Sequence, residues 1–139
     1  MSKFLYLLFV LLLFLLFQIF YSCQWIEHEP VQIVIKSEYI QLEWNPPSVN
    51  EKDVSPIISY IMYYRIHGMK EWRRLDLIPA EQNPTYTIYH SELGNGSYDF
   101  AVRAITSDNR VSNLHSSLDY AADPIGGWYI VWIRFEDED

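Results

Sequence analysis

From Pro30 onward the sequence alternates apolar and polar residues in short stretches, interrupted by turn-forming residues at intervals of roughly ten positions. In one of these stretches Ile40, Leu42 and Trp44 share one phase, while Gln41 and Glu43 share the other. A β-strand places successive side chains on opposite faces, so this alternation is typical of a strand with one buried face. The pattern favours an all-β chain folded as a two-sheet sandwich of about seven strands.

Other segments of the chain repeat this alternation. The further expected strands are 31–35, 57–66, 72–77, 85–89 and 98–104. Asn45-Pro46-Pro47 ends the strand before it, because proline has no amide hydrogen for a sheet ladder. The chain has 139 residues, of which 50% are hydrophobic and 17% aromatic. This is enough for one core without metals or disulfides, and we predict a single domain over residues 30–135.

Three groups of residues, in this order along the chain, resemble a fibronectin type III domain. They are Leu42-Glu43-Trp44-Asn45-Pro46-Pro47; then Ile57, Tyr60, Met62, Tyr64 and Arg65; then Leu93, Gly96, Tyr98, Phe100, Val102 and Ala104. The resemblance implies an immunoglobulin-like sandwich in which Trp44 is the core tryptophan. It also implies that Tyr98 forms a tyrosine corner, with its ring in the core and its hydroxyl bonded to the backbone a few residues upstream.

The chain departs from this family at two points. Ser107 to Arg110 stand where integrin-binding members carry Arg-Gly-Asp, so that activity is not implied. The sequence also continues past the usual end of the domain, through Gly126-Gly127 into the aromatic run Trp128 to Phe135. This run is either the last strand after a long loop or a strand added beyond Leu114 to Tyr120. We favour the first, because two glycines flanked by aromatic residues begin a strand well.

The N-terminal residues have the layout of an export signal. Lys3 precedes the apolar stretch Phe4 to Phe17, in which the Tyr6 hydroxyl is the one polar group. A positive start followed by such a stretch predicts a signal peptide over residues 1–22. Extended to Tyr21, the apolar run reaches about 18 residues, the lower limit for a membrane-spanning helix. An uncleaved N-terminal transmembrane anchor is therefore the alternative.

Cys23 is the single cysteine of the chain, and an exported domain with one unpaired thiol is unusual. Phe20-Tyr21-Ser22-Cys23 resembles a lipobox, the bacterial lipoprotein motif, although that family prefers a small residue where Tyr21 stands. The resemblance implies that Cys23 carries acyl chains, which anchor the protein in the cell envelope. It implies the outer membrane, because Gln24 is not the aspartate that often retains such proteins at the inner membrane. The alternative is a cysteine near an ordinary cleavage site; in either case 23–29 is a tether.

Charge and motifs argue against several functions. The formal net charge of −8 makes nucleic acid an unsuitable partner. The sequence has no glycine-rich phosphate loop, no His-Glu-x-x-His motif, no Gly-x-Ser-x-Gly motif and no Cys-x-x-Cys pair. The histidines are far apart, at His28, His67, His90 and His115. We predict a protein that is not an enzyme and holds no cofactor or metal; residues 136–139 are interpreted as a hydrated acidic tail.

Exposed tryptophans are the predicted binding surface, namely Trp72, Trp128 and Trp132. Both phases of the run Trp128 to Phe135 are apolar, whereas one core buries one face of a strand. Either another part of the domain covers the second face, or that face contacts a protein, a sugar or the membrane. The sequence thus predicts a membrane-anchored, non-catalytic binding, adhesion or scaffolding module with an unknown ligand. The alternative is a carbohydrate-recognition accessory domain that uses its tryptophans.

Overall fold

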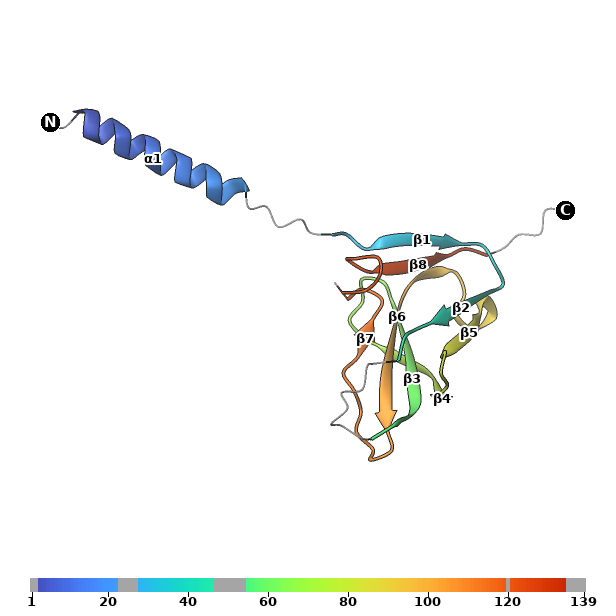
Figure 1. Ribbon diagram of the computed structural model, residues 1–139. Coiled ribbons are helices and arrows are strands. Elements are labelled where there is room, and N and C mark those ends of the chain that lie inside the picture. Colours follow the sequence, from blue (N-terminus) through green and yellow to red (C-terminus); the bar gives the residue numbers. More distant parts are fainter. Residues whose placement is uncertain (1–2, 23–27, 47–54, 120, 135–139) are drawn as a thin grey trace.

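The structure, a computed structural model, describes residues 3–22, 28–46, 55–119 and 121–134. It contains an N-terminal helix, α1 (Lys3–Ser22), and a β-sandwich (Figure 1). The side chains from Leu7 to Leu15 of α1 are exposed. Within the part of the chain that the structure describes in full, no helix is long and apolar enough to cross a membrane. Cys23 and the acidic tail 136–139 lie outside the described residues.

The sandwich consists of two sheets. Sheet A contains, in spatial order, β1 (Val31–Ile35), β8 (Trp128–Trp132), β6 (Gly96–Thr106), β3 (Ile57–Ile66) and β4 (Arg73–Pro79), and the short β7 (His115–Ser116) also pairs with β6. Sheet B contains β2 (Tyr39–Glu43) and β5 (Thr85–Tyr89), and β5 leads into the short helix α2 (His90–Leu93). The prediction of an all-β two-sheet sandwich is confirmed.

The first strand joins the larger sheet. β1 pairs in parallel with β8, with Val31 opposite Trp128 and Ile35 opposite Trp132. Because β1 extends sheet A, it does not lie in sheet B beside β2, and β2 has β5 as its one strand neighbour among the described residues. The second edge of β2 therefore has no strand partner in the described part of the chain, and we call it the free edge of β2.

The core lies between the sheets and is built from alternate residues of the strands. Its buried members are Ile40, Leu42, Met62, Ile88, Tyr98, Phe100, Ile130 and Trp132. In β2 the side chains of Ile40 and Leu42 face inward while their neighbours face solvent, as the sequence alternation predicts. Trp44 packs against this core but remains partly exposed.

The last strand of the sandwich is interrupted. β3 occupies one edge of β6, and both β7 and β8 pair along the other edge, with His115 opposite Val102 and Ile130 opposite Tyr98. Between them residues 118–119 and 121–127 leave the sheet, and we call these residues the excursion. The Trp128 N–H donates to the Ser117 carbonyl at 2.7 Å, which joins the two ends of the excursion. β8 thus completes the last strand, of which β7 is the first part.

Two glycines close the excursion. Gly127 has φ +82°, and a Cβ there would overlap the Ser117 carbonyl and lie 2.6 Å from Leu118 Cα. Gly126 has φ +94°, and a Cβ there would lie 2.7 Å from the His28 carbonyl oxygen. Both the backbone conformation and the close approach therefore require glycine.

Candidate functional site

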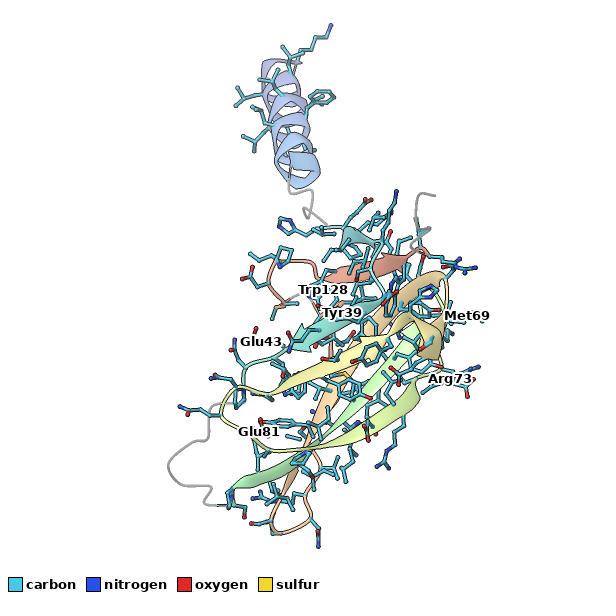
Figure 2. All side chains as sticks on the ribbon, turned by 90° about the vertical axis from the view of Figure 1, so that its right-hand side faces the viewer. Tyr39, Glu43, Met69, Arg73, Glu81 and Trp128 are labelled. Atoms are coloured by element: carbon cyan, nitrogen blue, oxygen red, sulfur yellow. The ribbon has the colours of Figure 1, made fainter. Side chains whose placement is uncertain are left out.

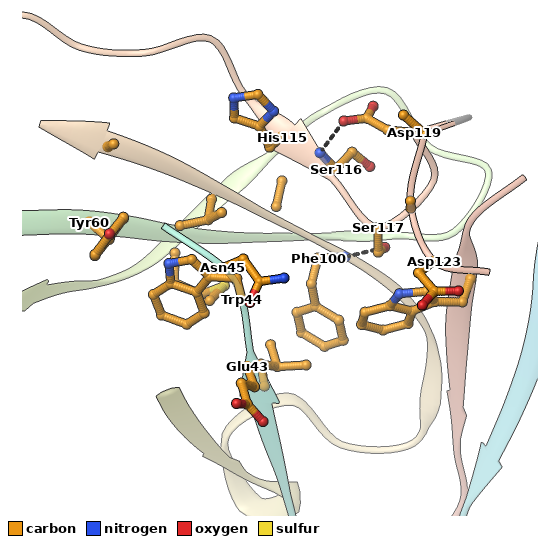
Figure 3. A pocket seen from close by; sticks show the side chains of 18 of the residues that line it. Glu43, Trp44, Asn45, Tyr60, Phe100, His115, Ser116, Ser117, Asp119 and Asp123 are labelled. Carbon is orange, nitrogen blue, oxygen red and sulfur yellow. Dashed lines mark hydrogen bonds between the residues drawn. The ribbon is translucent and has the colours of Figure 1, made fainter. Parts of the chain in front are cut away.

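A hollow of about 540 Å³ opens between the end of β2 and the interrupted last strand (Figure 3). Its apolar wall includes Trp44, Tyr60, Met62, Phe100 and Trp128. Its polar rim includes Glu43, Asn45, His115, Asp119 and Asp123. We call this hollow the aromatic cleft. Apolar walls with a few polar groups at the rim are typical of ligand sites.

Trp44 forms one wall of the aromatic cleft. Its ring contacts Tyr60 edge-on, with 5.3 Å between the ring centroids and 80° between the planes. Its backbone N–H donates to the Pro84 carbonyl at 3.4 Å, which holds the residue at the end of sheet B. The indole Nε1 is buried and has no hydrogen-bond partner in the described part of the chain. Since buried indole N–H groups usually have an acceptor, an unsatisfied donor lies in the wall of this cleft.

Trp128 and the excursion form the second wall of the aromatic cleft. The Trp128 ring lies 6.5 Å from the Phe100 ring, centroid to centroid, and its side chain is half-buried. The excursion brings Asp119 and Asp123 to the rim (Figure 3). Asp119 is held in place because its carboxylate accepts from the Ser116 N–H at 2.9 Å.

The rim of the aromatic cleft is acidic. Its carboxylates are Glu43, Asp119 and Asp123, and the described lining residues include no lysine or arginine. The lining also includes one histidine, His115. A cleft lined by charges of one sign attracts ligands of the opposite sign.

A second hollow, of about 320 Å³, follows the free edge of β2, and we call it the edge groove. Its apolar lining is Ile33, Ile35, Ile40, Leu42, Trp128 and Ile130. It shares Leu42, Glu43 and Trp128 with the aromatic cleft, so the two hollows adjoin. Figure 2 shows Tyr39, Glu43 and Trp128 near one another on this side of the sandwich.

The outer face of sheet A differs from this open side. Asp99 is 0% exposed there, and its carboxylate accepts from Arg65 Nε at 2.8 Å and lies 2.7 Å from His67 Nδ1. The Arg65 guanidinium lies 4.2 Å from the centre of the Trp72 ring. His67 stacks on Tyr129, with ring centroids 3.8 Å apart. We call these five residues the Asp99 row, in which every side chain has a partner.

The structure separates the three tryptophans that the sequence predicts as a binding surface. Trp132 is 1% exposed, and its Nε1 donates to the Ser37 carbonyl at 2.8 Å. Its assignment to a binding surface is therefore wrong, because the inward phase of β8 places it in the core. Trp72 is covered on one face by Arg65. Trp128 lines both hollows and is positioned to contact a ligand.

Tyr98 occupies the position expected of a tyrosine corner. Its ring is 5% exposed, and its hydroxyl donates to the Leu93 carbonyl at 2.8 Å. Burial raises the pKa of this phenol, and the nearby Tyr64 raises it further. The residue therefore ties the start of β6 to the turn before it.

Sequence reasoning missed the acidic rim and the Asp99 row. Glu43 is expected only as a solvent-facing residue of its strand, and the alternation places Asp99 outward but gives it no partner. The structure pairs Asp99 with Arg65 directly across β6 and β3. Opposite charges on two expected strands are a usable signal, but it requires the register of the two strands. Among the described residues no cluster of three or more His, Cys, Asp or Glu could hold a metal ion.

Comparison with known proteins supports the fold. No protein-family model matches the sequence, and no curated protein matches it either. A solved structure of the fibronectin(III)-like modules of CbhA from Clostridium thermocellum is similar, with a TM-score of 0.50 and 10% sequence identity. The match covers 78% of this chain and 94% of that chain. The sandwich therefore has the fold of a fibronectin type III-like module.

Proposed function

We propose that this chain is a membrane-anchored, non-catalytic binding module of the bacterial cell envelope, and that the aromatic cleft is its ligand site. The observation that carries the proposal is one hollow that combines an aromatic wall, in which Trp44 and Trp128 are only partly buried, with an acidic rim. The indole N–H of Trp44 is moreover unsatisfied in the described structure. Fibronectin type III-like sandwiches support binding at loops and strand edges, and the cleft lies where a loop and a strand edge meet.

The contacts of the cleft serines support binding rather than hydrolysis. Ser117 Oγ accepts from the Phe100 N–H at 3.1 Å, and Ser116 Oγ accepts from the Leu118 N–H at 3.1 Å. Ser112 Oγ accepts from the Ala104 N–H at 2.9 Å. Each hydroxyl thus serves the backbone, and no hydrogen bond links one of them to His115 in the described structure. A nucleophile needs an adjacent base, and these serines have none in place.

Anchoring through Cys23 is the second part of the proposal. The lipobox-like sequence Phe20 to Cys23 supports it, as does the apolar helix α1, which ends at Ser22 directly before the cysteine. Each acyl methylene buried in a bilayer contributes about 0.8 kcal/mol, so several chains hold a protein essentially permanently. In this proposal residues 23–29 are the tether between the lipid and the sandwich, and the outer membrane is the proposed location.

Metabolic labelling with a fatty-acid analogue tests the anchor. We expect label on the wild-type chain and on Ser22→Ala, which keeps a small residue at that position, and none on Cys23→Ala. Membrane fractions should contain the first two proteins. Wild-type protein without label would overturn lipid anchoring.

A second candidate function is recognition of a carbohydrate, alone or beside an envelope enzyme. The observation that favours it is the presence of Trp44 and Trp128 with Asn45, Asp119 and Asp123 around one hollow. Indole rings stack on sugar faces, carboxylates accept hydrogen bonds from sugar hydroxyls, and an amide both donates and accepts them. A glycan array tests this function, with Trp128→Ala expected to lose binding and Trp72→Ala expected to keep it. Silence across the array would remove this candidate.

A further inference from the structure

We propose that the ligand is an extended peptide segment with basic side chains, which pairs with the free edge of β2 and places alternate side chains in the edge groove and the aromatic cleft. This inference rests on the proposed binding function and names the class of partner. It combines the backbone of β2, the shape of the two hollows and the charge around them.

The backbone of β2 has hydrogen-bonding groups that no described strand uses. The Glu38 carbonyl accepts from His90 N–H at 2.7 Å, and Trp44 N–H donates to the Pro84 carbonyl, so the even-numbered residues direct their backbone toward β5. In an antiparallel pair the intervening residues direct N–H and C=O to the opposite side. Gln41 and Glu43 therefore present both groups at the free edge, without a partner among the described residues.

Tyr39 limits the available edge at one end. Its carbonyl accepts a hydrogen bond from the Ser37 hydroxyl. The unused backbone thus begins at Gln41 and continues toward the aromatic cleft, which is the direction in which the hollows adjoin. An added strand would pair with β2 along this length and widen sheet B, the smaller sheet.

The two hollows supply the places for alternate side chains. Residues i and i+2 of a strand point to one face. Inward-pointing residues of an added strand would meet the apolar lining at Ile33, Leu42 and Trp128, and then the wall of the aromatic cleft. The unsatisfied Nε1 of Trp44 lies in that wall.

Charge determines the chemistry of the partner. The described lining of the two hollows includes three carboxylates, at Glu43, Asp119 and Asp123, and no lysine or arginine. The whole chain carries −8. Lysine or arginine side chains complement this rim and accelerate encounter at low salt. A second copy of the same chain brings the same negative charge to the same edge and is disfavoured.

The edge can be blocked without disturbing sheet B. Gln41→Pro removes an N–H that faces away from β5, so the β2–β5 ladder keeps its hydrogen bonds. Gln41→Thr keeps the N–H and is the matched control. Glu43→Gln removes a rim charge with little change in size.

The test uses fluorescence anisotropy with the full chain in nonionic detergent micelles. The probes are capped, dye-labelled peptides: one alternates lysine and valine, one alternates glutamate and valine, and one is the lysine–valine peptide with alternate amides N-methylated. We expect the lysine–valine peptide to bind at least about tenfold more tightly than either of the other two. Gln41→Pro should weaken its binding about tenfold and Glu43→Gln about threefold, while Gln41→Thr should match the wild type.

Equal binding of the lysine–valine peptide to wild type and Gln41→Pro would overturn strand pairing, since it would show unspecific attraction to an acidic protein. Binding of the glutamate–valine peptide with equal affinity would overturn the charge argument. If the peptides fail but the glycan array is positive and depends on Trp128, the peptide inference is wrong while the proposed binding function stands. Silence of both would contradict the inference and the proposed function together.

Discussion

The two sides of this sandwich use the same kinds of side chains in opposite ways. In the Asp99 row, aromatic rings and charges are matched to one another: Arg65 with Asp99 and Trp72, and His67 with Asp99 and Tyr129. On the open side, the indole N–H of Trp44, the Glu43 carboxylate and the backbone of Gln41 have no such partners in the described structure. An exposed aromatic residue or a charge in this sandwich therefore supports the proposed ligand site only where its hydrogen-bonding and stacking capacity is unused.

The largest contrast is between two tryptophans of β8. Trp132→Ala should lower the free energy of unfolding by about 3–5 kcal/mol, because it empties a fully buried position. Trp128→Ala should cost only about 1–2 kcal/mol, since this side chain is only partly buried and lines both hollows. Urea unfolding monitored by circular dichroism measures both. Equal losses would show that Trp128 is a core residue and would weaken its assignment to the ligand site.

The next contrast is between two carboxylates. Asp99→Ala should reduce the free energy of unfolding by about 2–4 kcal/mol, because it leaves Arg65 and His67 without their buried acceptor. Glu43→Ala should change it by less than about 0.5 kcal/mol, as expected at a surface position without partners. Thermal unfolding of the two variants compares them. A large loss for Glu43→Ala would mean that the rim charge is structural.

A smaller effect is expected from a hydroxyl in the core. Tyr98→Phe should cost about 1–2 kcal/mol, because the Leu93 carbonyl loses its donor. Tyr39→Phe is the matched control, since that side chain is exposed at the free edge. The raised pKa of Tyr98 means that the unfolded chain releases this proton first as pH rises, so stability should fall above about pH 10 in the wild type and less in Tyr98→Phe. Unfolding midpoints at increasing pH test this expectation.

The smallest effect is expected at an exposed pair in the turn after β6. Hydrogen bonding from Thr106, with help from Arg110, lowers the pKa of Asp108 to about 2 from a usual 3.8. Its stabilising contribution should be complete above about pH 4 and lost as the pH falls toward about 2. Asp108→Asn should flatten this part of the stability curve slightly. No difference between the two curves would show that solvent screens the pair fully.

The sequence predicted the elements of the fold better than their arrangement. Alternation correctly assigned Ile40 and Leu42 to the inner face of β2, and the resemblance to fibronectin type III domains placed the corner at Tyr98. The alternation could not predict which side chains of β8 face inward, because both phases of this strand are apolar. On the outer face Tyr129 of β8 is covered by His67, which is far away in the sequence. Such a contact can be predicted only when the order of the strands is known.

The candidate site was predicted less well than the fold. The sequence singles out Trp128, which lines both hollows, and its role in binding stays a prediction. The acidic rim depends on the excursion, which brings Asp119 and Asp123 toward the end of β2. The free edge depends on β1 pairing with β8 rather than β2. Both are long-range choices of pairing, and local residue patterns contain little information about them.

The hydrogen bond between Trp128 and Ser117 has a consequence for how such a module can diversify. It holds the two ends of the excursion at adjacent positions of the sheet, and Gly126 and Gly127 allow the chain to return to the sheet there. Lengthening or replacing the residues between these ends adds little to the entropic cost of closing the loop. The excursion can therefore be replaced, in evolution or by design, to alter the rim of the aromatic cleft while the two sheets fold unchanged.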